Sequence, residues 1–339
     1  MLTVLDHLPP GLLDCEAVKL ADVLPGPTLI HLHGRRQPPL FVSVLLHGDE
    51  DTGWLAMRRL LREMGDAELP RALSLFIGNV QAARRRQRML PGQADYNRVW
   101  ILGDTAPENA EQAMTLAVWR AMRERGGFAS GDVHNNTGLN PHYACVRRLD
   151  AAFLQLATLF SRTVVYFTKP DGVQAEAFAR LCPAVTVECG QPGHAYGVEH
   201  AAEYLNACLH LAAIPAHPVP AHDIDLYHSV AIVKVPPDVS FTFNSDAADI
   251  RLAPDLDTLN FRVLPADTLL GRVRPGAGAC LTVLDEHGRD AVARYLRVVD
   301  GEIRTIVPVV PAMFTLNLRA IRQDCLGYFM ESRAPRSGG

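Results

Sequence analysis

A histidine and a glutamate follow an apolar run near the start of the chain. Residues 41–46 read Phe-Val-Ser-Val-Leu-Leu, and His47, Gly48, Asp49 and Glu50 come next. An imidazole and a carboxylate three residues apart on one turn can both reach a single divalent cation, and this pairing of nitrogen and oxygen donors suits zinc. Taken alone, a His-x-x-Glu pair is more often a polar turn after a strand, so other residues must support a metal site.

Two further candidates for chemistry lie on turns later in the chain. His134 lies in the segment 131–138, which reads GDVHNNTG, and Glu188 ends the apolar run 184–187. Each has a plainer alternative: an Asn/Thr/Gly turn for His134 and a surface residue for Glu188. His31 and His33 alternate with apolar neighbours and could also act as ligands, but the exposed face of an edge strand is the more usual place for such a pattern.

A basic cluster precedes another polar motif. Arginines occupy positions 84, 85, 86 and 88, and Asp95-Tyr96-Asn97-Arg98 follows. Such a cluster is most often a solvated surface, and nucleic-acid contact is a minority alternative because no aromatic residues or second basic patch flank it. Arg and Asn side chains in a loop beyond a strand end can instead bind a carboxylate or a carbonyl through several oriented donors.

The elements that must position these residues alternate between strand and helix. The run 41–46 is typical of a strand buried on both faces, and apolar residues from Trp54 to Leu61 then recur at helical spacing. A second buried strand at 73–77 implies parallel pairing through a right-handed crossover. Helices are predicted over 107–125 and 198–212, and short strands at 163–167 and 184–187. The predicted class is α/β, with a mostly parallel or mixed central sheet flanked by helices and ligands bound at the carboxyl ends of its strands.

The pattern changes after a proline-rich segment. Pro215, Pro218 and Pro220 read as a linker, and from about 222 to 330 short apolar or alternating runs are punctuated by Pro, Gly and Asp. This pattern is typical of a small all-β domain. We therefore predict a catalytic domain over residues 1–215, a β-rich C-terminal domain over 216–330 and a disordered tail over 331–339.

Composition excludes several classes of partner. The 339 residues carry a formal net charge of −4, so nothing attracts the whole chain to nucleic acid or to an anionic membrane. Seven scattered cysteines without a Cys-x-x-Cys pair favour reduced thiols and a cytoplasmic location. No stretch reaches the length of a membrane span. The oligomeric state is left open, and a homo-oligomer is compatible with the sequence.

Taken together, the motifs resemble one family. The chain is similar to the succinylglutamate desuccinylase and aspartoacylase family of the zinc carboxypeptidase superfamily, over roughly residues 40–195. The family pattern is His-Gly-x-Glu after the first strand, Asn and Arg in a basic loop, Asp-x-Asn-Arg, Asp-x-His and Glu-x-Gly. The matching residues are His47-Gly48-Asp49-Glu50, Asn79 with Arg88, Asp95-Tyr96-Asn97-Arg98, Asp132-Val133-His134 and Glu188-Cys189-Gly190.

The resemblance implies a role for each matching residue. His47, Glu50 and His134 would hold one zinc ion and leave a position for water, and Asp95 would orient the ring of His47. Glu188 would act as general base and then return the proton to the leaving amine. Arg88 would stabilise the oxyanion and contact the substrate, whose carboxylate Asn97 and Arg98 would hold.

The resemblance implies a hydrolase that cleaves the amide bond of an N-acyl amino acid. The alternatives are a metallocarboxypeptidase acting on short peptides and a non-catalytic relative that only binds a ligand. Val80 and a longer loop at 89–94 depart from the family pattern. The residues that hold a second substrate carboxylate in aspartoacylases have no clear counterpart, Arg180 being the nearest candidate and Tyr328 a poorer one, so the acyl group is left open.

Overall fold

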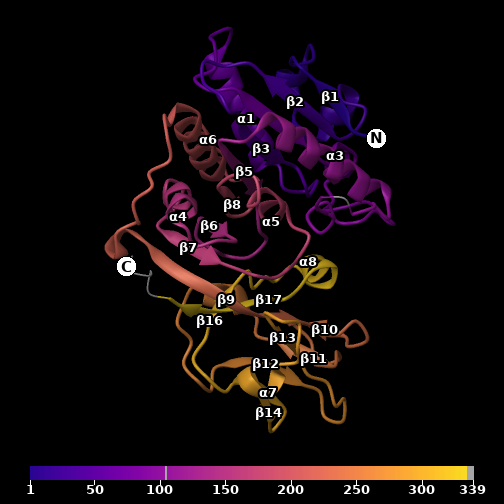
Figure 1. The fold of residues 1–339 in the computed structure, drawn as a ribbon. Coiled ribbons are helices and arrows are strands. Elements are labelled where there is room, and N and C mark those ends of the chain that lie inside the picture. The colour runs from indigo at the N-terminus through magenta and orange to yellow at the C-terminus, as the bar shows by residue number, and fades with distance from the viewer. Residues whose placement is uncertain (104, 334–339) are drawn as a thin grey trace.

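The computed structural model describes residues 1–103 and 105–333, and the described residues form two β-sheets with helices around them. The large sheet has 12 strands and the small sheet has 5 (Figure 1). The predicted α/β class, with a large central sheet, flanking helices and a smaller β-rich part, is confirmed.

The centre of the large sheet is parallel. Strand β3 (Leu40–Val44) pairs in parallel with β4 (Leu73–Ile77) and with β5 (Ala129–His134), and β5 pairs in parallel with β8 (Ala184–Glu188). Outside β4, β2 (Thr28–Leu32) is antiparallel to β4, and β1 (Thr3–Leu5) forms the edge. Because β3, β5 and β8 run in the same direction, the residues that follow them meet at one edge of the sheet.

Beyond β8 the sheet continues into the C-terminal part of the chain. Its further strands, in spatial order, are β6 (Tyr143–Val146), β7 (Thr163–Tyr166), β9 (Asp225–Lys234), β17 (Gly327–Ser332) and β16 (Val310–Ala312), and β13 (Thr282–Asp285) also pairs with β9. The parallel pairing of β7 with β9 carries the sheet across residue 215, the boundary predicted from the prolines. The division into two domains therefore stays a prediction.

Helices cover both faces of the central strands. On one face, α1 (Thr52–Met64) packs against α6 (Ala195–His210), and α4 (Ala151–Thr158) lies beside β6 and β8. On the other face, α5 (Gln174–Phe178) lies against β5 and β8, and Phe178 stacks on Phe41 of β3. α3 (Ala110–Arg125) packs beside α5, where Trp119 Nε1 donates to Ala177 O over 3.1 Å. Two local signals bound α3, because the Asn109 side chain accepts from the Gln112 backbone N–H and Gly126 ends the helix at φ 73°. A short helix, α2 (Val80–Arg84), follows β4.

The small sheet has its own hydrophobic core. Its strands, in spatial order, are β10 (Phe241–Thr242), β11 (Ile250–Leu252), β12 (Leu269–Val273), β15 (Glu302–Thr305) and β14 (Leu296–Val299). Two short helices, α7 (Val292–Tyr295) and α8 (Leu318–Gln323), lie in the same part of the chain, which is therefore β-rich and not wholly β. Glu331 and Ser332 belong to β17, because they continue its pairing with β9, so the predicted disordered tail is wrong for these two residues. Residues 334–339 of that tail lie outside the described residues.

One expectation for the first strands is also wrong. Strand β2 is not an edge strand, since β1 and β4 flank it, and His31 is only 7% exposed, with its Nδ1 2.9 Å from Ser74 Oγ. His33 is exposed, as expected. Across the described part of the chain, every helix falls short of the length and apolar character needed to cross a lipid bilayer.

Candidate metal centre and active site

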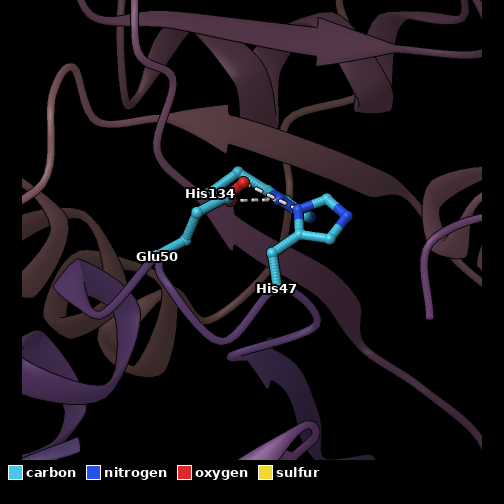
Figure 2. A group of neighbouring side chains, drawn as sticks. All are labelled: His47, Glu50 and His134. Atoms are coloured by element: carbon cyan, nitrogen blue, oxygen red, sulfur yellow. Dashed lines mark hydrogen bonds and ion pairs between the residues drawn. The ribbon is translucent and has the colours of Figure 1, made fainter. Parts of the chain in front are cut away.

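Three side chains converge where β3 and β5 end. His47 and Glu50 lie on the connection from β3 to α1, and His134 is the last residue of β5. One ligand atom from each lies within 4.8 Å of the others, and all three residues are buried (Figure 2). Gly48 permits this tight connection, because a Cβ there would collide with the backbone of Ala82 and Ala83. The structure thus brings together the three residues predicted to be ligands.

The two histidines present the same nitrogen to one carboxylate. His47 Nδ1 lies 2.7 Å from Glu50 Oε1, and His134 Nδ1 lies 2.7 Å from Glu50 Oε2. Burial lowers the pKa of His134, but Asp132 and Glu50 outweigh it and hold that pKa well above the usual value. Two imidazole nitrogens facing one carboxylate can share protons with it or can share one divalent cation. The two-nitrogen, one-oxygen donor set therefore fits zinc.

A second carboxylate stands behind each ring. Asp95 Oδ1 lies 3.0 Å from His47 Nε2, and Asp132 Oδ2 lies 2.9 Å from His134 Nε2. Ser43 Oγ donates to Asp132 over 2.6 Å and so holds that carboxylate in turn. Metal-binding histidines commonly donate their other ring nitrogen in this way, which sets the tautomer and the ring orientation. Asp95 therefore contacts His47, and Asp132 contacts His134, at the ring nitrogen that faces away from Glu50.

Glu188 faces the same centre from the neighbouring strand. It is the last residue of β8 and is the register partner of His134 on β5. Its side chain is buried, and Asn136 Nδ2 donates to its Oε2 over 3.2 Å. Burial raises the pKa of Glu188, although the nearby His134 opposes the shift. A carboxyl group whose pKa is raised toward neutrality is suited to exchanging protons.

The basic loop divides into an inner and an outer part. Arg88 donates to Asp95 Oδ2 over 2.9 and 3.1 Å, and its Nη1 lies 3.6 Å from Glu50 Oε1. In contrast, the arginines at positions 84, 85 and 86 are exposed. The predicted solvated surface is therefore confined to these three positions.

Asn97 and Arg98 lie beside the same centre, but both already have partners. Asn97 Oδ1 accepts from the Gln174 backbone N–H over 2.9 Å, and its Nδ2 lies 3.3 Å from His134 Nε2. Arg98 Nη2 donates to both oxygens of Asp324, over 3.0 and 3.1 Å. Asp324 also lies 3.4 Å from Arg88 Nη2.

A cavity of about 360 Å³ joins these groups. Its lining includes all the residues predicted for the site except Asp95, which lies behind His47: His47, Glu50, Arg88, Asn97, Arg98, His134 and Glu188. This volume is in the range of small-molecule sites, roughly 300–1,000 Å³. Tyr328 also lines the cavity, whereas Arg180 is exposed two residues after α5 and is not part of the lining, so its candidacy for a second substrate carboxylate is wrong.

Three residues of the centre were not assigned a role from the sequence. Asp132 stands two residues before His134 on one strand, and this alternation, which puts both side chains on one face, could have indicated it. Asn136 lay in a segment that also reads as an ordinary turn. Asp324 is 136 residues beyond Glu188 in a segment without a recognisable motif, so no local signal could have indicated it.

The fold and the centre can now be compared with known proteins. No family model matches the chain, and no curated protein matches its sequence. Solved structures do match along most of its length. The succinylglutamate desuccinylase of Chromobacterium violaceum is 16% identical, with a TM-score of 0.56 over 90% of this chain and 87% of that chain.

Two other solved structures match similarly. Murine aminoacylase 3 is 14% identical, with a TM-score of 0.57 over 88% of this chain and 97% of that chain. The succinylglutamate desuccinylase/aspartoacylase of Rhodobacter sphaeroides is 14% identical, with a TM-score of 0.58 over 89% of this chain and 88% of that chain. The chain thus has the fold of the succinylglutamate desuccinylase and aspartoacylase structures, and the resemblance seen in its motifs is confirmed at the level of the fold.

Proposed function

We propose that this protein is a zinc-dependent hydrolase that cleaves the amide bond of an N-acyl amino acid. The observation that carries the proposal is the single cavity into which the His47, Glu50 and His134 group, Glu188 and two arginines project. The similar structures support it, because their names describe a succinylglutamate desuccinylase, an aminoacylase and a succinylglutamate desuccinylase/aspartoacylase.

His47, Glu50 and His134 would hold the zinc ion through two Nδ1 atoms and one carboxylate. When bound by three protein ligands, zinc lowers the pKa of a water molecule from 15.7 to about 7 and polarises a carbonyl group. Asp95 and Asp132 keep the two rings in place, since each accepts from the nitrogen that faces away from Glu50.

Glu188 would carry the proton transfers. As general base it takes a proton from the attacking water, and as general acid it delivers that proton to the nitrogen of the leaving amine. Its burial supports this assignment, because the raised pKa of Glu188 makes the carboxyl group both a better base and an acid that acts nearer neutral pH. Asn136 orients the carboxylate by donating to Oε2.

The arginines would bind the two negative charges of the reaction. Arg88 would stabilise the charge that develops on the carbonyl oxygen, and its contacts with Asp95 hold the guanidinium in a defined orientation. Arg98, with Asn97 beside it, would hold the carboxylate of the amino acid. Replacing Arg88 by Ala should therefore reduce mainly kcat, since an oxyanion contact is strongest in the transition state.

A substrate screen tests the proposal. Acetyl-, succinyl- and formyl-amino acids, together with a dipeptide, are incubated with zinc-loaded protein, and release of the amine is measured. We expect release from at least one N-acyl amino acid, its loss after treatment with a chelator and its recovery on adding zinc. Cleavage of the dipeptide alone would favour a carboxypeptidase, and no release from any compound would favour a protein that only binds a ligand.

Three accompanying proposals concern the cellular compartment, the ligand and the domain organisation of the protein. All seven cysteines are free, which agrees with a reducing compartment such as the cytoplasm. The partner is a small molecule with a carboxylate, since the cavity is the size of a small-molecule site. The β-rich segment 216–330 forms a domain that contributes to this cavity through residues such as Asp324.

A further inference from the structure

The cavity extends from the metal centre over one face of the large sheet. Thr186, Cys145 and Val165 are register neighbours on β8, β6 and β7, and all three line the cavity. Ser229 and Met330 are register neighbours on β9 and β17 and continue the same lining. Paired residues project to the same face of a sheet, so these five side chains form one continuous surface. We call this surface the floor of the cavity.

The floor is uncharged. The floor residues Val165 and Met330 belong to a small hydrophobic cluster, separate from the two larger cores, whose other buried members are Tyr143, Val310 and Ala312. The polar groups on the floor are the neutral hydroxyl groups of Thr186 and Ser229 and the thiol of Cys145, and the Tyr143 hydroxyl also lines the cavity. A carboxylate placed over this floor would lose its hydration without gaining a cation.

Each lysine and arginine side chain that lines the cavity is either exposed at its margin or already paired with a carboxylate. Lys169 is 42% exposed and pairs with Asp171, and Arg319 is exposed on α8. Arg88 and Arg98 pair with Asp95 and Asp324. Among the described residues that line the cavity, these four are the only lysines and arginines.

One side of the cavity above the floor lies next to Arg98. Phe167, Lys169, Pro170 and Val173 line the cavity, and the segment they belong to runs alongside the Asp-x-Asn-Arg motif. There the Trp100 backbone N–H donates to Gly172 O over 3.0 Å, and the Gln174 N–H donates to Asn97 Oδ1. The part of the cavity above the floor, which we call the chamber, therefore lies next to Arg98, the residue proposed to hold the substrate carboxylate.

In an amino acid, the carboxylate and the side chain are bonded to the same carbon atom. A carboxylate on Arg98 therefore directs the amino-acid side chain, and not the more distant acyl chain, into the adjoining chamber. We propose that the amine half of the substrate is an amino acid with an apolar side chain of about the size of leucine, methionine or phenylalanine. This inference rests on the proposed deacylase function and adds the class of amino acid to it.

The first test compares substrates that differ only in the amino acid. N-acetyl derivatives of alanine, leucine, phenylalanine, aspartate and glutamate are hydrolysed by the zinc-loaded protein, and kcat/KM is measured for each. Each methylene buried contributes a factor of about four, so leucine should exceed alanine by roughly fiftyfold. The two acidic derivatives should fall at least about a hundredfold below leucine. A preference for the acidic derivatives would overturn the proposal. If that preference then disappeared in Lys169→Ala, the side-chain carboxylate of these substrates would bind Lys169 at the margin of the cavity.

A second arm separates the amino-acid side chain from the acyl chain. N-acetyl-, N-butanoyl- and N-hexanoyl-alanine are compared in the same assay. A kcat/KM that rises with the acyl chain while leucine and alanine derivatives react equally would overturn the proposal, because the chamber would then hold the acyl group.

A variant with a smaller chamber tests the location. Val165→Phe should lower kcat/KM for the leucine derivative at least tenfold more than kcat/KM for the alanine derivative. Val298→Phe, on an exposed position of β14, is the matched control and should change neither value. Equal values for the leucine derivative in Val165→Phe and wild type would contradict the assigned location.

A binding measurement with free amino acids tests this inference separately from the proposed deacylase function. Titration calorimetry compares leucine with aspartate on the zinc-loaded protein, independently of turnover. Absence of all hydrolysis would refute the deacylase function, while tighter binding of leucine would still support an apolar chamber. Tighter binding of aspartate, or binding of neither amino acid, would overturn the inference.

Discussion

Asp324 already binds Arg98, the residue proposed to hold the carboxylate of the substrate. Its two oxygens accept from Arg98 over 3.0 and 3.1 Å, and its side chain is only 22% exposed. Burial raises the pKa of Asp324, but Arg98 and Arg88 outweigh it, so the pKa is lowered and the group is an anion at neutral pH. A substrate carboxylate must therefore share or displace a carboxylate that the chain itself supplies.

Replacing Asp324 by Asn should strengthen the binding of carboxylate substrates. A hydrogen bond to a charged partner contributes about 1.5–3 kcal/mol, so releasing Arg98 should lower KM by roughly tenfold to a hundredfold. The catalytic groups remain, so kcat should change little. The variant should also lose about 1–3 kcal/mol of folding stability, because two guanidinium groups lose a partly buried anionic partner.

The assay compares an N-acetyl amino acid with its C-terminal amide. The amide lacks the carboxylate, so its KM should be the same in Asp324→Asn and in wild type, whereas KM for the acid should fall. Asp267→Asn is the matched control, because it breaks an exposed ion pair with Arg297, 2.8 Å long, in the small-sheet region. A higher KM for the acid in Asp324→Asn would refute the reasoning, since it would mean that Asp324 positions Arg98 for the substrate.

Four further predictions follow from the contacts described above. Glu188→Gln should retain zinc, measured by atomic absorption, and lose turnover; an active variant would remove Glu188 from the mechanism. Arg98→Ala should raise KM by roughly tenfold to a hundredfold with zinc content unchanged, whereas Arg84→Ala, at an exposed position, should have no effect. Asp132→Ala should weaken zinc binding by about 10–100-fold in a competition titration with a chelator, and unchanged affinity would contradict its orienting role. Burial, aided by Arg125, lowers the pKa of His31 to about 4, below its ordinary value of 6.5. The neutral ring therefore stabilises the fold above pH 6.5, and about 3 kcal/mol should be lost as the pH falls to 4. Urea unfolding of His31→Gln should show a smaller loss over that range than wild type, and an equal loss would contradict this assignment.

Much of the metal centre could be predicted from the sequence because its signals are local. The apolar run before His47 and the helical spacing after Glu50 predict a strand, a turn and a helix, and β3 and α1 are found there. A strand that ends in His134 or Glu188 puts that residue at the edge where parallel strands end. The order of such strand ends along the chain therefore indicates which side chains can meet.

Tertiary structure alone decided how the cavity is lined and which charges are free. A period of two shows which residues of a strand share a face, but it does not show which strand lies beside them. The floor of the cavity combines β8, β6 and β7 with β9 and β17, so Cys145 and Met330 share one lining although they lie 185 positions apart in the sequence. His31 lies in a strand inside the sheet, where it is the register partner of Ser74 on β4 and contacts that hydroxyl group. Asp324 reaches Arg98 because the pairing of β17 with β9 positions the segment that precedes β17, in which Asp324 lies three residues before Gly327. Contacts over such separations depend on strand order and register, which local residue patterns do not encode.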